Sequence, residues 1–165
     1  MMNTIKKIPR LYETRFSFGA TAAIITNLSL IAGLRTGSHA KTSIIGAMLV
    51  IALADNISDS LGIHVYQESE CLDIRETWFS TLTNFLTRII VSLTFIMLVL
   101  LMPINTAVIS SIIWGLLLLS TMSYLIAKDR KISPYKAIFE HLFIAVMLIL
   151  ASNFVGAWLI GKAQF

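Results

Sequence analysis

Two acidic residues interrupt an otherwise apolar stretch of this chain. Asp55 and Asp59 lie inside residues 44–65, a segment hydrophobic enough to cross a membrane. Residues four apart share one face of a helix, with Cβ atoms roughly 5–6 Å apart. Two negative charges this close repel in a low-dielectric medium, so either one carboxylate takes a proton or a cation lies between them. The pair therefore predicts a proton site or a metal-ion site.

Other candidate ligands follow near one end of the predicted spans. His64 and Glu68 repeat the spacing of four, and Glu140 with His141 enters the last apolar segment from the same side. Oxygen and imidazole ligands suit iron(II), manganese(II) or zinc, and the same groups suit a proton relay. With a polar partner from the first segment, the candidate metal-site residues are Asp55, Asp59, Asn27, His64, Glu68, Glu140 and His141.

Each of these residues also has a structural interpretation. Arg88 lies about as deep in the third apolar segment as Asp55 does in the second, so the two could form an ion pair that needs no ligand. Asp59 would then be the carboxylate left free for chemistry. The acidic stretch 68–76 also fits a solvated loop, and Glu140 fits an acid near a helix start. The sequence leaves these alternatives open.

Composition requires a lipid environment. Of the 165 residues, 56% are hydrophobic and only 13% are charged, against about 25% charged in a soluble domain. A soluble fold of this size could not hide so much apolar surface. The basic residues lie in loops without interleaved aromatics, which argues against a nucleic-acid partner. With one cysteine, Cys71, the sequence excludes an intrachain disulfide, and no nucleophile–base pair or phosphate loop indicates an enzyme.

Five segments are long enough to cross a bilayer as helices, since a span needs about 20 apolar residues. They lie at about 16–34, 44–65, 78–101, 104–127 and 136–160. Pro103 breaks the chain between the third and fourth segments. The first segment is longer than a typical signal-peptide core and is expected to stay uncleaved. We predict an all-α integral membrane protein with a single five-span domain covering residues 1–165.

The distribution of positive charge predicts the orientation. Nine basic residues fall on one side of the spans: Lys6, Lys7, Arg10, Arg15, Arg75, Lys128, Arg130, Lys131 and Lys136. Three fall on the other side: Arg35, Lys41 and Lys162. Because positive loops stay inside, the N-terminus is expected in the cytoplasm and the C-terminus outside, in a multi-pass protein of a bacterial inner membrane.

Two runs of residues resemble the vacuolar iron transporter family. The run from Gly19 to Leu34 is similar to that family's first span, and Asn56 to Gly62 is similar to its second-span motif. Pro103 at the end of the third span and Gly156 in the fifth also fit the family pattern. The resemblance implies a five-span homodimer with a cytoplasmic N-terminus. It also implies an ion path along the dimer axis, where ferrous or manganous ions exchange for protons.

The chain departs from that family at three places. Ala22 stands where the family has a first-span aspartate, and Asp59 stands where it has a second-span methionine. The family's large cytoplasmic metal-binding domain is reduced here to the acidic stretch 68–76. Either the carboxylate has moved between neighbouring helices, or transport was lost or its substrate changed.

The expected function is that of a homodimeric carrier that exports divalent metal ions, iron(II) or manganese(II), in exchange for protons. Asp59 would be the central site, with Asp55 and Asn27 beside it, and His64, Glu68, Glu140 and His141 would form a cytoplasmic entrance. The alternative is a non-transporting protein of the same fold, whose polar residues fasten helices together or hold a partner.

Overall fold

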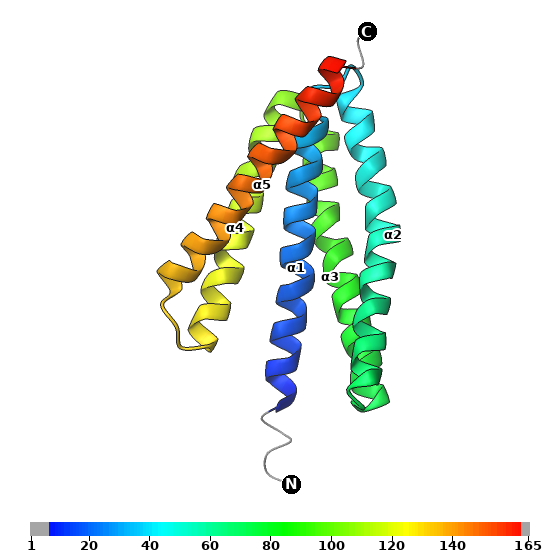
Figure 1. The fold of residues 1–165 in the computed structure, drawn as a ribbon, viewed down its shortest axis with the longest axis vertical. Coiled ribbons are helices and arrows are strands. Elements are labelled where there is room, and N and C mark those ends of the chain that lie inside the picture. Colours follow the sequence, from blue (N-terminus) through cyan, green and yellow to red (C-terminus); the bar gives the residue numbers. More distant parts are fainter. Residues whose placement is uncertain (1–6, 163–165) are drawn as a thin grey trace.

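The chain folds into five long helices with short connections (Figure 1). The computed structural model describes residues 7–162, without the side chains of residues 7–17, 160 and 161. The helices are α1 (Lys7–Leu34), α2 (Ala40–Ser69), α3 (Ile74–Leu101), α4 (Ile104–Asp129) and α5 (Pro134–Lys162). No strand occurs within residues 7–162, so the predicted all-α class is confirmed for this part of the chain.

Four of the helices are long and apolar enough to cross a membrane, and α1 contributes a shorter apolar helix, Phe18–Leu34. Their outward faces carry large apolar side chains, of which Leu53, Ile57 and Leu61 on α2 are each more than half exposed. Because water would not tolerate such a surface on every helix, the fold is that of a multi-pass membrane protein. The helices extend a few residues beyond the predicted spans, as at the start of α2.

The connections end the helices where the sequence predicts. Pro103 lacks an amide hydrogen and separates α3 from α4 after a single residue, Met102, as expected. Asp73 caps α3 by accepting hydrogen bonds from the backbone N–H groups of Arg75 (2.9 Å) and Glu76 (3.3 Å). This part of the acidic stretch 68–76 therefore has a structural role.

The helices alternate in direction, so the α2–α3 and α4–α5 connections lie at one end of the bundle, which we call the lower end (Figure 1). Arg75, Lys128, Arg130 and Lys131 belong to these connections, whereas Arg35 and Lys41 lie by the α1–α2 connection at the upper end. The side chains of the other predicted cytoplasmic basic residues, Lys6, Lys7, Arg10 and Arg15, lie outside the described residues.

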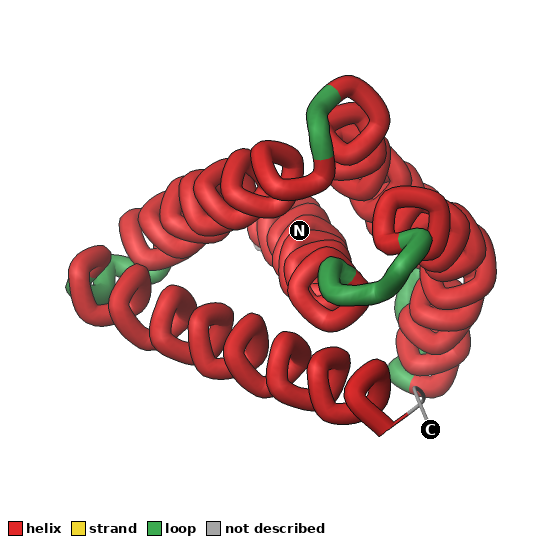
Figure 2. Tube along the Cα trace, turned by 90° about the horizontal axis from the view of Figure 1, so that it is seen from above, coloured by secondary structure: helices red, strands yellow, loops and turns green. Residues whose placement is uncertain are grey.

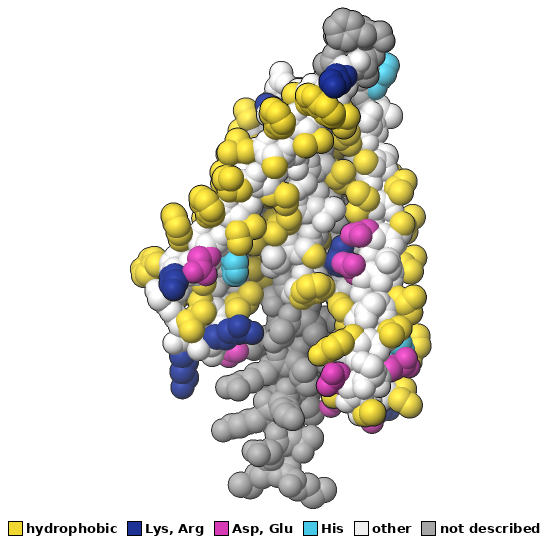
Figure 3. Space-filling model, viewed as in Figure 1, with side chains coloured by type: hydrophobic (Ala, Val, Ile, Leu, Met, Phe, Trp, Pro, Cys, Tyr) yellow, Lys and Arg dark blue, Asp and Glu magenta, His cyan; other side chains and the backbone are white. Residues whose placement is uncertain are grey.

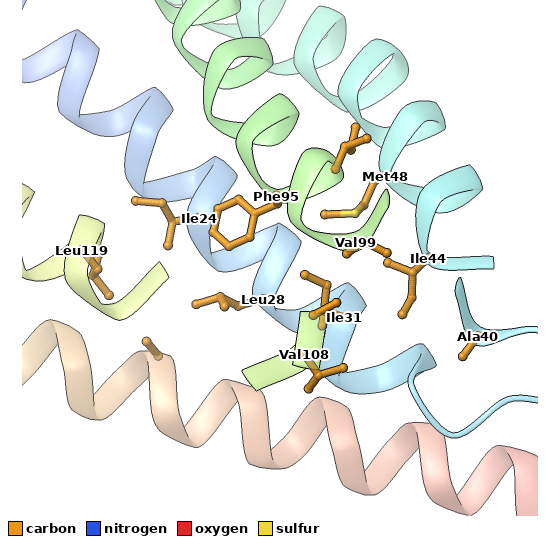
Figure 4. Close-up of a cluster of buried hydrophobic side chains, with 13 residues drawn as sticks. Ile24, Leu28, Ile31, Ala40, Ile44, Met48, Phe95, Val99, Val108 and Leu119 are labelled. Atoms are coloured by element: carbon orange, nitrogen blue, oxygen red, sulfur yellow. The ribbon is translucent and has the colours of Figure 1, made fainter. Parts of the chain in front are cut away.

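Helix α1 occupies the middle of the bundle, with the other four around it (Figure 2). In the upper half the core is apolar: Ile24, Leu28 and Ile31 of α1 pack with Phe95 and Val99 of α3 (Figure 4). Ile44 and Met48 of α2 join this cluster.

Helices α1 and α5 cross at two glycines. A Cβ at Gly156 would overlap the carbonyl oxygen of Gly33 and lie 2.7 Å from its carbonyl carbon. Gly115 of α4 is similarly close to the Leu28 side chain, where a Cβ would lie 2.8 Å from a methyl carbon. Small residues thus let the backbones approach, which is how helices associate in lipid.

Candidate functional site

Arg88 lies at the centre of the candidate site. Its side chain is buried between α2 and α3 and donates to three acceptors on α2. Nη2 lies 2.5 Å from Asp55 Oδ2, Nε lies 2.6 Å from Asn56 Oδ1, and Nη1 contacts Asp59 Oδ2. We call Asp55, Asn56, Asp59 and Arg88 the arginine cluster.

The local sequence explains this convergence. Asp55 and Asp59 share a face of α2 because they are one helical turn apart, and Asn56 lies between them. Arg88 lies opposite this face because α3 runs antiparallel to α2. Asp55 lies near the midpoint of α2, and Arg88 lies near the midpoint of α3. The rigid, planar guanidinium presents several donors at once, which a lysine ammonium at the same place would not do.

The cluster carries one unbalanced formal charge. Two carboxylates and one guanidinium sum to −1, and all three belong to the middle of long apolar helices. The arginine side chain is 2% exposed, whereas those of Asp55 and Asp59 are 43% and 40% exposed. Figure 3 shows acidic and basic side chains together about halfway along the face where α2 lies, with apolar side chains around them. The excess negative charge therefore lies on the outward-facing side of the cluster, which we call its open side.

One conditional expectation is wrong. The Asp55–Arg88 pair forms as the first alternative predicted, but Asp59 is not left free, because the same guanidinium contacts it. The ion pair predicted from equal depth in the membrane named Asp55 alone, and the structure adds Asp59 as a second partner of the same arginine. The spacing of four already contained the signal, since a guanidinium that reaches Asp55 from a neighbouring helix also comes within reach of Asp59.

The other predicted ligands lie elsewhere in the bundle. Asn27 donates to Ser92 Oγ (3.0 Å) and to the Ala23 carbonyl (2.7 Å), and so fastens α1 to α3. His64 lies farther toward the lower end, where Nε2 is 3.3 Å from Glu68 Oε1 and Nδ1 is 3.1 Å from Thr81 Oγ1. These side chains do not join the arginine cluster.

The two candidates on α5 are also separate. Glu140 is exposed and lies 4.0 Å from Lys136 Nζ, one turn earlier on the same helix. His141 Nδ1 lies 2.7 Å from Ser123 Oγ of α4. Within the described part of a single chain, no three His, Cys, Asp or Glu side chains come together as a group that could hold a metal ion.

Polar side chains continue from the arginine cluster toward the lower end. Asn84 Nδ2 of α3 donates to Ser60 Oγ of α2 at 3.2 Å, and Gln67 Nε2 of α2 donates to Ser80 Oγ of α3 at 2.8 Å. All four side chains are buried. We call Asn56, Ser60, Gln67, Thr77, Ser80, Asn84 and Arg88 the polar α2–α3 interface.

This interface escaped sequence reasoning, although its signal was present. Polar residues recur on α3 at intervals of three and four, the spacing of a buried helix face, where apolar residues are expected: Thr77, Ser80, Asn84 and Thr87.

Comparison of the chain with protein-family models, with curated proteins and with solved structures finds no match.

Proposed function

We propose that the protein is a membrane carrier that exchanges a cation for protons at the arginine cluster. The observation that carries this proposal is the second carboxylate. A structural ion pair for Arg88 needs one acid, but Asp55 and Asp59 both contact it and leave a formal charge of −1 in the middle of apolar helices. An isolated charge there costs about 2.5–3.5 kcal/mol on insertion scales, so a proton or a cation is needed to balance it.

Proton binding and cation binding are mutually exclusive in this arrangement. A proton on either carboxylate balances the cluster and weakens that carboxylate's bond to Arg88. A divalent ion bound by both carboxylates would change the formal charge of the cluster from −1 to +1 and would be repelled by the guanidinium, which already contacts one oxygen of each acid. Binding of the ion would therefore weaken the bonds of both acids to Arg88. Two ligands that compete for one site, each leaving when the other arrives, give the exchange that an antiporter requires.

The cargo we propose is iron(II) or manganese(II), exported from the cytoplasm. Carboxylate oxygens are suitable ligands for these ions, and the resemblance of Gly19–Leu34 and Asn56–Gly62 to the vacuolar iron transporters supports the same class of substrate. We further propose a homodimer, because the half-exposed Asp55 and Asp59 face outward from the single chain and need cover from lipid.

The test is manganese flux in proteoliposomes that contain the purified protein, with a pH gradient across the membrane. Wild type is expected to move Mn²⁺ in the direction opposite to the flow of protons. Asp55→Asn and Asp59→Asn are each expected to abolish this coupled flux. Asp129→Asn is the matched control, because Asp129 is an aspartate at the end of α4. Wild-type rates in both cluster variants would contradict the assignment of the site.

A second candidate function is that of a non-transporting subunit, and the bridging of both carboxylates by Arg88 specifically favours it. In that case the cluster only joins α2 to α3. Wild type would then move neither Mn²⁺, Fe²⁺ nor protons. Replacing all three charged residues together with leucine would leave the protein folded and as stable as wild type, as buried ion pairs often allow.

A further inference from the structure

The contact between α2 and α3 differs between its two halves. In the upper half it is apolar, with Ile44 and Met48 near Phe95 and Val99 (Figure 4). In the lower half the buried positions of the two helices are Thr87 and the residues of the polar α2–α3 interface defined above. At the upper end, within the described residues, only the Lys41 ammonium of α2 bonds to this region, donating to the carbonyls of Leu100 (2.9 Å) and Met102 (3.2 Å) at the end of α3. The buried polar side chains that bond α2 to α3 therefore lie from the arginine cluster downward.

The polar half has the length of half a membrane. Asn56 and Gln67 are eleven residues apart on α2, which corresponds to about 16 Å along a helix axis. The hydrocarbon core of a bilayer is roughly 30 Å thick. Because the arginine cluster lies near the midpoints of both helices and Gln67 lies two residues before the end of α2, the interface connects the centre of the protein with its lower end.

Four polar atoms of this interface have no hydrogen-bond partner among the described residues: Asn56 Nδ2, Asn84 Oδ1, Gln67 Oε1 and Thr77 Oγ1. They occur along its whole length, and all four side chains are at least nine-tenths buried. Buried polar groups without a protein partner are normally satisfied by ordered water. Asn84 Oδ1 also lies close against α1, since a Cβ at Gly19 would come within 2.7 Å of it, so only glycine fits beside this oxygen.

From these observations we propose that the polar α2–α3 interface is a water-filled proton path inside each protomer, running from the lower end to Asp55 and Asp59. It rests on the proposed exchange function and supplies the proton's route. At about 2.8 Å per hydrogen bond, roughly six bonds through water and hydroxyl groups would cover the distance. The His64–Glu68 pair stands near the outer end of the path, where Thr81, the partner of His64, bonds to the Thr77 carbonyl.

Hydration of the path is testable without any transport. Water-edited solid-state NMR of the full-length protein in lipid bilayers measures how fast magnetisation passes from water to side-chain amides. The amides of Asn56, Asn84 and Gln67 are expected to receive it as fast as that of Asn153, which lies by exposed Arg35. Asn27 is the matched control, because it is equally buried but donates to both Ala23 and Ser92.

Slow transfer to Asn56 and Asn84, equal to that of Asn27, overturns the proposal even where Mn²⁺ flux is normal. Fast transfer in a protein that moves no protons leaves the water-filled interface standing and overturns the proposed function instead. The two failures are therefore distinguishable.

A second test of the path replaces the buried hydroxyl of Thr77, which has no hydrogen-bond partner among the described residues. Thr77→Val keeps the shape of the side chain and is expected to slow proton-coupled Mn²⁺ flux severalfold and to reduce water transfer to Gln67. Ser111→Ala is the matched control, because Ser111 Oγ is also buried and unpartnered but belongs to α4. Unchanged flux together with a raised melting temperature in Thr77→Val would show that the hydroxyl met no water, and would overturn the path.

Discussion

At the scale of the residue, the arginine cluster concentrates more charge than a structural contact between two helices needs. Arg88 is almost fully buried, whereas the side chains of Asp55 and Asp59 are about two-fifths exposed. Its guanidinium therefore lies on the protein side and the two acids on the open side. In the proposed exchange, the two acids are therefore the members of the cluster that an arriving proton or cation would meet first.

Removing the arginine is expected to harm stability more than removing either acid. Arg88→Leu leaves two carboxylates without a counter-charge and is predicted to cost about 3 kcal/mol, at the low end for a broken buried pair because the acids are partly exposed. Asp55→Asn should cost less, because Asp59 still pairs with the arginine. Thermal unfolding in detergent measures both, and equal melting temperatures for wild type and Arg88→Leu would contradict the prediction.

The hydrogen bonds of Ser123 predict the tautomer of His141. Ser123 Oγ donates its only proton to the Leu119 carbonyl at 2.7 Å, so it accepts from His141 Nδ1 at 2.7 Å. The neutral imidazole should therefore carry its proton on Nδ1 and leave Nε2 as the acceptor. Nitrogen-15 chemical shifts of the ring report the tautomer, and a proton on Nε2 would show that the serine bonds differently. Ser123→Ala should remove the preference.

At the scale of the element, helix pairs differ in what holds them together. Helices α1 and α5 meet at glycines, α1 and α3 meet through apolar side chains and the Asn27–Ser92 bond, and the lower halves of α2 and α3 meet through polar side chains. Lipid offers no hydrophobic drive between helices, so close approach and hydrogen bonds decide which faces pair.

The α1–α5 crossing is expected to be sensitive to one methyl group. Gly156→Ala places a Cβ against the Gly33 backbone, which cannot move aside as a flexible side chain does. Overpacking of this kind typically costs about 1–3 kcal/mol. Gly62→Ala is the matched control, because a Cβ there meets nothing within 4 Å and alanine is the better helix former. Thermal unfolding in detergent should therefore show a lower melting temperature for Gly156→Ala but not for Gly62→Ala.

The cap of α3 makes a smaller contribution. Asp73→Ala removes the acceptor for the backbone N–H groups of Arg75 and Glu76 and should cost about 1 kcal/mol. Asp73→Asn keeps an oxygen acceptor and should stay close to wild type. Hydrogen exchange at the first turn of α3 measures the local effect, and unchanged exchange in the alanine variant would argue that the cap is not needed.

At the scale of the whole molecule, the lower end of the bundle carries two of the helix connections and the outer end of the proposed proton path. The α2–α3 and α4–α5 connections lie together at this lower end (Figure 1). We predict that this end faces the cytoplasm, because it holds Arg75 and the basic residues around Lys131.

The single cysteine provides the test of orientation. Cys71 is exposed in the α2–α3 connection, so a membrane-impermeant maleimide should label it in inverted vesicles but not in intact spheroplasts. Cys71→Ser carrying Ser38→Cys should show the reverse, because residue 38 lies in the α1–α2 connection at the other end. Labelling of Cys71 in intact spheroplasts would show that the topology, and with it the proposed direction of export, is the reverse of the one predicted here.

The sequence by itself determined the membrane class, the five helices and the place where α3 gives way to α4. These follow from composition, from apolar lengths matched to a bilayer and from Pro103, all of which act locally along the chain. Equal depth in antiparallel neighbours also predicted that Arg88 could reach Asp55.

Only the tertiary structure decided what those residues do together. Whether Arg88 contacts one acid or two, and whether Asn27, His64 and Glu140 join them, depends on how far each helix is rotated about its axis. Rotation is set by packing over many residues, above all by where α1 allows its neighbours to approach. For the same reason, a polar stripe visible on α3 became an interface only once α2 was seen to face it.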